Sequence, residues 1–235
     1  MHRLAILPRR SNQIYCTEGL GSLLKRGLAF ALWLIFEYRT YYLYMEATEC
    51  LRLPNEEDVL PKVNDCTLRV VNGNQEAYEL EAEGLEFRSY VSNAEERLEK
   101  GAIAFCFFVG QELAHIGWVA LTQEAKDALG VPPYRVDFSN DEACSDSIWT
   151  NPKYRGMKFR TYGTFKRLEF LRAKGIKTKR TAIAKDNVAS QKGRAMLSLP
   201  GPHAEGRYLR ILWWKWWMEK QLTLDSDKEQ SNASD

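Results

Sequence analysis

Two apolar segments near the middle of the chain constrain the fold most, because both have strand character and almost nothing separates them. Residues 102–109 (AIAFCFFV) and 112–121 (ELAHIGWVAL) are rich in apolar and aromatic side chains, which favour strands. Only Gly110 and Gln111 lie between them, and such a short polar break favours a tight hairpin. The sequence therefore predicts an antiparallel pair of strands at this point.

Helix-like and strand-like segments alternate along the rest of the chain. We expect further strands at residues 67–71 (TLRVV), 144–150 (CSDSIWT), 179–184 and 207–217 (RYLRILWWKWW). We expect helices at residues 75–83, 94–100 and 159–174, and another that runs through Met196 with its N-cap at Asp186-Asn187. Residues 122–140 contain Pro132 and Pro133 and are expected to form a loop. This order predicts an α/β (α+β) fold in which helices cover the faces of a sheet.

The N-terminal part of the chain is predicted to be an extension. Residues 51–61 (LRLPNEEDVLP) have the composition of a connector, so we expect an extension over residues 1–53, a main domain over 54–222 and a disordered tail over 223–235. Within the extension, a helix is expected at residues 23–36 and a strand at 40–45. The apolar run in that helix is shorter than the about 20 residues that span a bilayer, so neither a transmembrane helix nor a signal peptide is expected. Packing of the helix on the domain and contact with a membrane surface both stay open.

The distribution of charge and the spacing of the cysteines give limited information about partners and cellular environment. The 33 Lys and Arg nearly balance the 31 Asp and Glu, yet residues 153–180 hold eleven basic residues and one acid, Glu169. This distribution predicts that one half of the fold faces something anionic. The five cysteines form no CxxC pair, so we expect no metal site and a reducing, cytoplasmic environment.

One turn in this basic region has the features of an anion site. Residues 154–160 (YRGMKFR) join an expected strand to an expected helix, and the first N–H groups of a helix lack partners within it. These donors would act together with the cationic side chains of Arg155, Lys158 and Arg160, which suits a pyrophosphate. A solvated basic helix start is the alternative.

The same turn resembles the pyrophosphate-binding motif of the GNAT superfamily of N-acetyltransferases, V-x-P-x-Y-R-G-x-G-x-G. Residues 150–160 read TNPKYRGMKFR, and four positions match the motif: Pro152, Tyr154, Arg155 and Gly156. Asn187 and Ser190 match the N-x-x-S pattern that opens the next helix in the family. The resemblance covers roughly residues 66–217. It implies a mixed, mostly antiparallel sheet with a splayed strand pair that takes acetyl-CoA or another acyl-CoA.

The resemblance also implies which residues would form the site. Those expected to hold the acyl-CoA are Ile148, Trp149, Thr150, Arg155, Gly156, Met157, Lys158, Phe159, Arg160, Thr161, Asn187 and Ser190. Those expected to take up a proton are His115, Asp146 and Glu112. Structural roles are equally open for His115, as a hydrogen-bonded strand residue, and for Asp146, as a solvated carboxylate.

The chain departs from the family pattern at three positions and in one segment: the family's glycine-aromatic ending of the helix after Asn187 is absent, and residues 197–207 read LSLPGPHAEGR in its place. Lys158 and Arg160 stand where the family has glycines, and Arg194 stands near its general-acid tyrosine. An arginine cannot donate a proton at neutral pH. These departures affect the catalytic step more than acyl-CoA binding.

We therefore expect an enzyme that moves an acyl group from acyl-CoA to an amine acceptor, such as a small amine or an amino sugar. A noncatalytic module that binds CoA or a protein partner is the alternative. Nucleic-acid binding through the basic run and the tryptophans at residues 213–217 is a third hypothesis, but we expect at least one face of these tryptophans to be buried in the core or in an interface. A homodimer is left open.

Overall fold

The computed structural model describes residues 36–222. These divide into a larger compact unit, residues 40–206 with 219–222, and a smaller one, residues 36–39 with Arg207–Met218. The expected helix at residues 23–36, except Phe36, and the expected tail at 223–235 lie outside the described residues. The expected domain boundary after residue 53 stays a prediction.

The strands form a sheet with the order β2-β3-β4-β5-β6-β1-β7-β8. Their bounds are β1 Phe36–Ala47, β2 Cys66–Val71, β3 Ile103–Val109, β4 Glu112–Ala120, β5 Glu142–Thr150, β6 Thr178–Ala184, β7 Ala204–Ile211 and β8 Trp214–Gln221. Pairing is antiparallel between β2 and β3, β3 and β4, β4 and β5, and β1 and β6, and it is parallel between β5 and β6. The predicted fold class, a mixed and mostly antiparallel sheet with helices on its faces, is confirmed.

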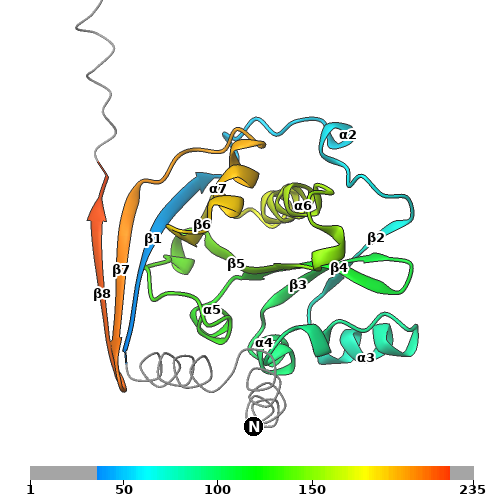
Figure 1. Ribbon diagram of the computed structural model, residues 1–235, viewed down its shortest axis with the longest axis horizontal. Coiled ribbons are helices and arrows are strands. Elements are labelled where there is room, and N and C mark those ends of the chain that lie inside the picture. Colours follow the sequence, from blue (N-terminus) through cyan, green and yellow to red (C-terminus); the bar gives the residue numbers. More distant parts are fainter. Residues whose placement is uncertain (1–35, 223–235) are drawn as a thin grey trace, which may run out of the picture. The chain divides into compact units, whose positions relative to one another are not determined.

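Helices cover both faces of the sheet in the larger unit (Figure 1). The α-helices are α2 Glu56–Val59, α3 Asn74–Ala82, α4 Ala94–Glu99, α5 Gln123–Ala128, α6 Phe159–Ala173 and α7 Val188–Ala195, and short 3-10 turns lie at Arg88–Tyr90, Phe138–Asn140 and Pro152–Tyr154. Figure 1 shows α6 and α7 on one face and α3, α4 and α5 on the other. Because helices cover both faces, all of β3 except Val109 is buried, and so is all of β4 except Glu112. This explains why both strands are continuous apolar runs in the sequence.

The core above the sheet is largely aromatic. Phe107 packs edge-on against Phe159 of α6, with ring centroids 6.4 Å apart, and Tyr154 packs against the same ring at 5.8 Å. Leu171 joins this cluster from the far end of α6. These contacts hold the first turn of α6 against β3 and against the Pro152–Tyr154 turn, at which the predicted anion-binding segment begins.

Three sequence expectations were wrong in detail. The expected loop at residues 122–140 contains α5, whose N-cap Thr122 accepts a hydrogen bond from the Ala125 N–H at 3.2 Å. The expected connector contains α2, where Val59 is buried in the core. The expected single strand at residues 207–217 consists of two strands joined by Leu212 and Trp213, with Leu212 in the left-handed region at φ 55°.

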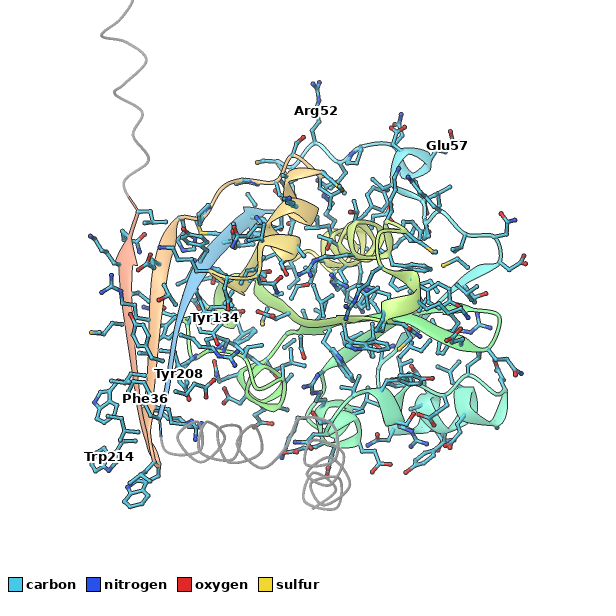
Figure 2. The ribbon with its side chains drawn as sticks, viewed as in Figure 1. Phe36, Arg52, Glu57, Tyr134, Tyr208 and Trp214 are labelled. Atoms are coloured by element: carbon cyan, nitrogen blue, oxygen red, sulfur yellow. The ribbon has the colours of Figure 1, made fainter. Side chains whose placement is uncertain are left out.

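The tryptophans of the smaller unit are not core residues. Trp213 is 76% exposed, and Trp214 and Trp216 stack on each other with centroids 6.1 Å apart while remaining 60% and 44% exposed. Figure 2 shows the ring of Trp214 extending away from the ribbon. The expectation of a buried core face is therefore wrong, and an interface role stays a prediction.

A buried carboxylate connects β1 to β6 and α7. Glu46 of β1 has no exposed surface and forms ion pairs with Lys179 of β6, at 2.5 Å, and with Arg194 of α7. Burial raises the pKa of Glu46, but the two cations and their hydrogen bonds lower it further, so the net shift is downward. Arg194, which resemblance placed near a catalytic position, is thus engaged in a structural ion pair.

We expect the Glu46→Ala variant to lose about 3–5 kcal/mol of unfolding free energy at pH 7, because it leaves two buried cations without their carboxylate. The folded-state pKa of Glu46 lies below its ordinary value of 4.5, so the carboxylate stabilises the fold fully above that pH. This contribution is lost as the pH falls through the folded-state pKa. Urea denaturation at pH 7 and in acid measures both effects. Glu142→Ala is the control: it removes the carboxylate that pairs with Arg180, and this ion pair is more exposed than the Glu46 pairs. It should therefore cost less unfolding free energy than Glu46→Ala, and equal losses would contradict the prediction.

Candidate functional site

Strands β5 and β6 run together at one end and then separate. Their parallel pairing comprises Glu142 with Thr178, Ala143 with Lys179 and Cys144 with Arg180. Strand β5 nevertheless continues to Thr150, and β6 continues to Ala184. The two strands therefore open a gap beyond Cys144.

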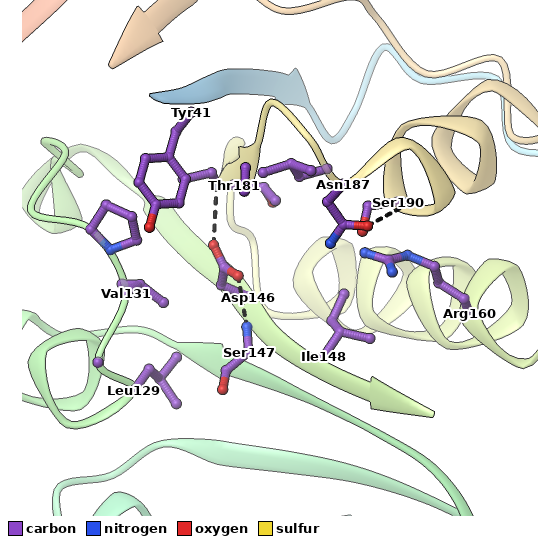
Figure 3. A pocket seen from close by; sticks show the side chains of 15 residues that line it. Tyr41, Leu129, Val131, Asp146, Ser147, Ile148, Arg160, Thr181, Asn187 and Ser190 are labelled. Atoms are coloured by element: carbon purple, nitrogen blue, oxygen red, sulfur yellow. Dashed lines mark hydrogen bonds between the residues drawn. The ribbon is translucent and has the colours of Figure 1, made fainter. Parts of the chain in front are cut away.

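Side chains, instead of backbone pairs, connect the strands where the gap begins. The Thr181 hydroxyl donates to the Ser145 carbonyl at 2.8 Å, and the Asp146 carboxylate accepts from the Ala182 N–H at 3.2 Å. The other Asp146 oxygen accepts from the Ser147 N–H at 2.7 Å (Figure 3). Backbone groups that would lose a ladder partner are thus satisfied, and the separation is a stable feature of the fold.

A β-bulge lies beside this point. Pairing between β4 and β5 skips from Ile116–Trp149 to Trp118–Asp146, so that Ser147 and Ile148 together face Gly117. Ser147 has a positive φ of 53°. A bulge of this kind bends a strand and redirects its side chains, and here it lies where β5 leaves β6.

The gap contains a cavity of about 230 Å³, which we call the β5–β6 cleft. Its lining residues are Tyr41, Leu129, Gly130, Val131, Pro132, Asp146, Ser147, Ile148, Arg160, Thr181, Ala182, Ile183, Ala184, Asn187 and Ser190. Figure 3 shows Asp146 and Ile148 from β5, Arg160 from α6 and Asn187 before α7 around the same space. Five of the predicted site residues therefore meet here: Asp146, Ile148, Arg160, Asn187 and Ser190.

Opposite charges line the cleft. Burial raises the pKa of the Asp146 carboxyl, while the N–H groups of Ser147 and Ala182 and the positive charges of Arg160 and Arg167 act against this shift. Burial lowers the pKa of Arg160, and Asp146 opposes that shift. A carboxyl group whose pKa is raised is a better proton acceptor once it is ionised.

His115 lies behind the cleft and does not line it. The side chain has no exposed surface, and its Nδ1 is 2.7 Å from the Thr150 hydroxyl. Burial, with Arg167 and Arg160 nearby, holds its pKa well below 6.5, so the imidazole is neutral. Its Nε2 has no hydrogen-bond partner among the described residues. The surroundings of His115 are those of a packed structural residue.

Glu112 is occupied at the outer end of β4. It accepts hydrogen bonds from Tyr154 at 2.6 Å and from Asn151 at 3.2 Å, and it pairs with Lys153 at 2.5 Å. These contacts, that of Lys153 first, lower the pKa of Glu112. The carboxylate holds the turn before α6 in place, and its lowered pKa makes it a weaker proton acceptor than an ordinary glutamate. Of the three predicted proton acceptors, only Asp146 lines the cleft.

The predicted phosphate turn has the expected course with an unexpected residue in it. Gly156 and Lys158 both have positive φ, 79° and 64°, so a lysine adopts the conformation that a glycine takes more readily. The Lys158 ammonium donates to the Asp58 carbonyl at 2.9 Å. Arg155 is exposed, whereas Arg160 turns inward to the cleft. Arg155 is therefore the cation that the turn presents outward.

The remaining predicted binding residues have other partners. Trp149 packs against Tyr90 with centroids 5.4 Å apart, and Thr150 contacts His115. Phe159 is in the core, and the Thr161 hydroxyl is buried near the Met196 sulfur at 3.9 Å. Met157 is half-buried, and its carbonyl accepts from the Lys62 N–H at 3.1 Å. None of these side chains lines the cleft.

The basic run is divided between the surface and the interior of the fold, and many of its side chains have partners. Five of its members pair with carboxylates: Lys153, Lys166, Lys177, Lys179 and Arg180. Arg167 is buried, and Arg172 donates to the Thr48 and Leu51 carbonyls. Arg155 and Lys174 are exposed without a carboxylate partner among the described residues, and the expectation that this half of the fold faces something anionic stays a prediction.

Sequence reasoning missed one wall of the cleft. Tyr41 was assigned to the extension, and residues 129–132 were assigned to a loop without a site, yet both line the cavity. The prolines and glycine of this segment predicted a loop, but they could not predict that the loop lies beside the cavity. Pairing of Tyr41 with Ala184 across β1 and β6 is what brings the first residue there.

The described residues contain neither a membrane-spanning helix nor a cluster of metal ligands. No helix between residues 36 and 222 is long and apolar enough to cross a membrane. In the same range, no three His, Cys, Asp or Glu side chains gather as a metal site.

The chain is similar in fold to several solved structures. No protein-family model matches the chain, and no curated protein matches it. A functionally unknown protein from Staphylococcus epidermidis is similar with TM-score 0.43 and 10% identity, over 80% of this chain and 66% of that one.

Two similar structures are described as GNAT acetyltransferases. The one from Novosphingobium aromaticivorans has TM-score 0.47 and 14% identity, over 74% of this chain and 64% of that one. The one from Colwellia psychrerythraea has TM-score 0.43 and 14% identity, over 81% and 61%. The chain spans less than two thirds of the length of each of these proteins. These likenesses are too distant to carry an argument about activity.

Two helix glycines test how tightly the site is packed. A Cβ at Gly163 of α6 would lie 2.7 Å from His115 Nε2, and one at Gly193 of α7 would lie 3.1 Å from the Arg160 Cδ. Gly→Ala within a helix ordinarily stabilises by about 1 kcal/mol. We expect Gly163→Ala to destabilise instead by about 1–3 kcal/mol, because the packed imidazole cannot move. Gly193→Ala should change stability by less than about 1 kcal/mol, since the Arg160 side chain is flexible. Urea denaturation decides, and a stabilised Gly163→Ala variant would contradict the packing described.

Proposed function

We propose that the protein is an N-acyltransferase that takes acyl-CoA, such as acetyl-CoA, and transfers its acyl group to an amine. The observation that carries the proposal is the separation of β5 from β6 around the β5–β6 cleft, directly before the turn into α6. The GNAT resemblance of that turn implies the same arrangement of donor and strands. Both lines of reasoning thus lead to one place in the fold.

The turn before α6 has the donors that a diphosphate requires. The first N–H groups of α6 have no acceptor within the helix, and Arg155 lies exposed beside them. Lys158 and Arg160 fit less well, because the first reaches the Asp58 carbonyl and the second lines the cleft. Arg155 is therefore the side chain that we assign to phosphate binding.

Two residues beyond β6 suit the rest of the donor. The Asn187 side chain caps α7 by accepting from the Ser190 N–H at 3.1 Å, and both residues line the cleft. Their polar groups face the opened edge of β5 at Ile148. We assign Ile148, Asn187 and Ser190 to the wall along which the thioester arm would lie.

Asp146 is the group that we assign to proton removal. In the transfer, the amine nitrogen bonds to the acyl carbon, the carbon–sulfur bond breaks and the thiolate leaves, while the amine proton passes to the carboxylate. Asp146 is held by two N–H groups at the start of the cleft, so its position is fixed before the acceptor binds. A small amine or amino sugar remains the proposed acceptor, and the cytoplasm the proposed location.

Binding of acetyl-CoA tests the donor assignment. We expect calorimetry to give micromolar binding for the wild type and a loss of about 10–100-fold for Arg155→Ala, the effect of one charged hydrogen bond. Lys174→Ala removes an exposed cation at the opposite end of α6 and should leave the affinity unchanged. Equal affinity in wild type and Arg155→Ala would contradict phosphate binding at this turn.

Turnover tests the role of Asp146. We expect Asp146→Asn to lower kcat by about 10²–10⁴-fold with any accepted amine. The pKa of Asp146 is raised above 3.8, so the wild-type rate should rise with pH through that shifted pKa and then level off, because the ionised form is the base. Thr181→Val removes the neighbouring cross-strand hydrogen bond without a carboxyl group and is the control. A similar loss of kcat in both variants would assign Asp146 a structural role only.

A noncatalytic CoA- or partner-binding module is the second candidate. It is favoured by Arg160, which extends into the cleft, and by Arg194, whose guanidinium pairs with Glu46. Acetyl-CoA binding that depends on Arg155, together with no transfer to any amine in a broad screen, would support this candidate over the enzyme.

A further inference from the structure

A second, smaller cavity lies on the α6–α7 side of the two separating strands. Its volume is about 20 Å³, and four basic side chains line it: Arg160 and Arg167 of α6, Lys179 of β6 and Arg194 of α7. A cavity needs about 10–15 Å³ to hold one water-sized particle. The space therefore admits a single small occupant.

The charges around this cavity do not balance. Glu46 pairs with both Lys179 and Arg194 and also acts on Arg167. Asp146 acts on Arg160 and Arg167. Four cations thus face two carboxylates, which leaves an excess of two positive charges. Burying uncompensated charge is costly, and here burial and the nearby Arg160 lower the pKa of Arg167 to about 9.

Arg167 has neutral hydrogen-bond partners, and one of its guanidinium nitrogens has no partner among the described residues. It is 1% exposed, and it donates to the Ser145 hydroxyl at 3.1 Å and the Thr164 hydroxyl at 3.2 Å. Its Nη1 has no hydrogen-bond partner within residues 36–222, and neither has the buried Nε of Arg194. Both guanidinium groups line the cavity and keep an unpartnered donor nitrogen. That of Arg167 lies close to Gly117 and Gly163.

We propose that this cavity binds one small monovalent anion of the size of chloride. A water molecule would accept hydrogen bonds there but would not reduce the excess positive charge, and sulfate or phosphate would exceed the volume. The anion would lie behind Arg160, which lines both this cavity and the β5–β6 cleft. The proposal does not depend on acyl transfer.

Thermal unfolding of the full chain in different sodium salts tests the proposal. At equal ionic strength, chloride and bromide should raise Tm relative to gluconate, whose anion is too large for the cavity. The rise should grow with the logarithm of the chloride concentration once that exceeds Kd, reaching about 2–4 °C at a concentration about fivefold above Kd. Equal Tm values in chloride and gluconate would mean that the cavity holds water only, and would overturn the proposal.

Two variants of α6 locate the effect. Arg167→Met removes a cavity cation, and we expect it to abolish the difference between chloride and gluconate. Arg172→Met is the matched control: it lies on the same helix and donates to backbone carbonyls away from the cavity, so it should lose stability equally in both salts and keep the chloride effect. A chloride effect that survives Arg167→Met would place the anion elsewhere and overturn the assignment.

A readout on the wild-type protein covers the case in which Arg167→Met does not fold. Crystals grown in bromide should give an anomalous peak between Arg167 and Arg194. Absence of such a peak at a bromide concentration well above the Kd obtained from the Tm shifts would also overturn the proposal.

Discussion

Two hydrogen bonds between side chain and backbone, at the point where β5 leaves β6, are the constraint on which the site depends. Thr181 binds the Ser145 carbonyl, and Asp146 binds the Ala182 N–H. They satisfy backbone groups that would otherwise require a continuous ladder, so the strands can separate without orphaned polar atoms. The same contact fixes Asp146 in the cleft. Opening the sheet and positioning the acidic group are therefore one structural event.

Buried charge is the second organising feature of the larger unit. The arginines and lysines of the basic run are distributed between the surface, partly exposed ion pairs and the interior beside α6. Glu46 joins β1 to β6 and α7 through two of them. Removing one partner of such a pair costs far more stability than forming the pair contributes. The main effect of these side chains is therefore to determine which elements pack together. Glycines at positions 117 and 163 leave the room that Arg167 and His115 occupy.

Strong local patterns predicted most elements and the turn before α6. The Asn187 cap was predictable because its side chain bonds within its own helix start. The hairpin at Leu212 and Trp213 was not, since its turn has none of the Asn or Gly residues that mark such turns. Asp146, His115 and Glu112 could not be ranked from sequence either. Their difference comes from the bulge at Ser147 and from strand register, and neither is encoded in a local pattern.

The position of β1 in the sheet has a consequence for synthesis. Tyr41 pairs with Ala184, so β1 is made long before the strand that it pairs with on that side. At about 5–20 residues per second, the delay is on the order of ten seconds. During this time Glu46, later without any exposed surface, stays in water beside an unpaired strand edge. The centre of the sheet is thus completed late, and the nascent chain must keep an early aromatic strand from pairing with the wrong partner.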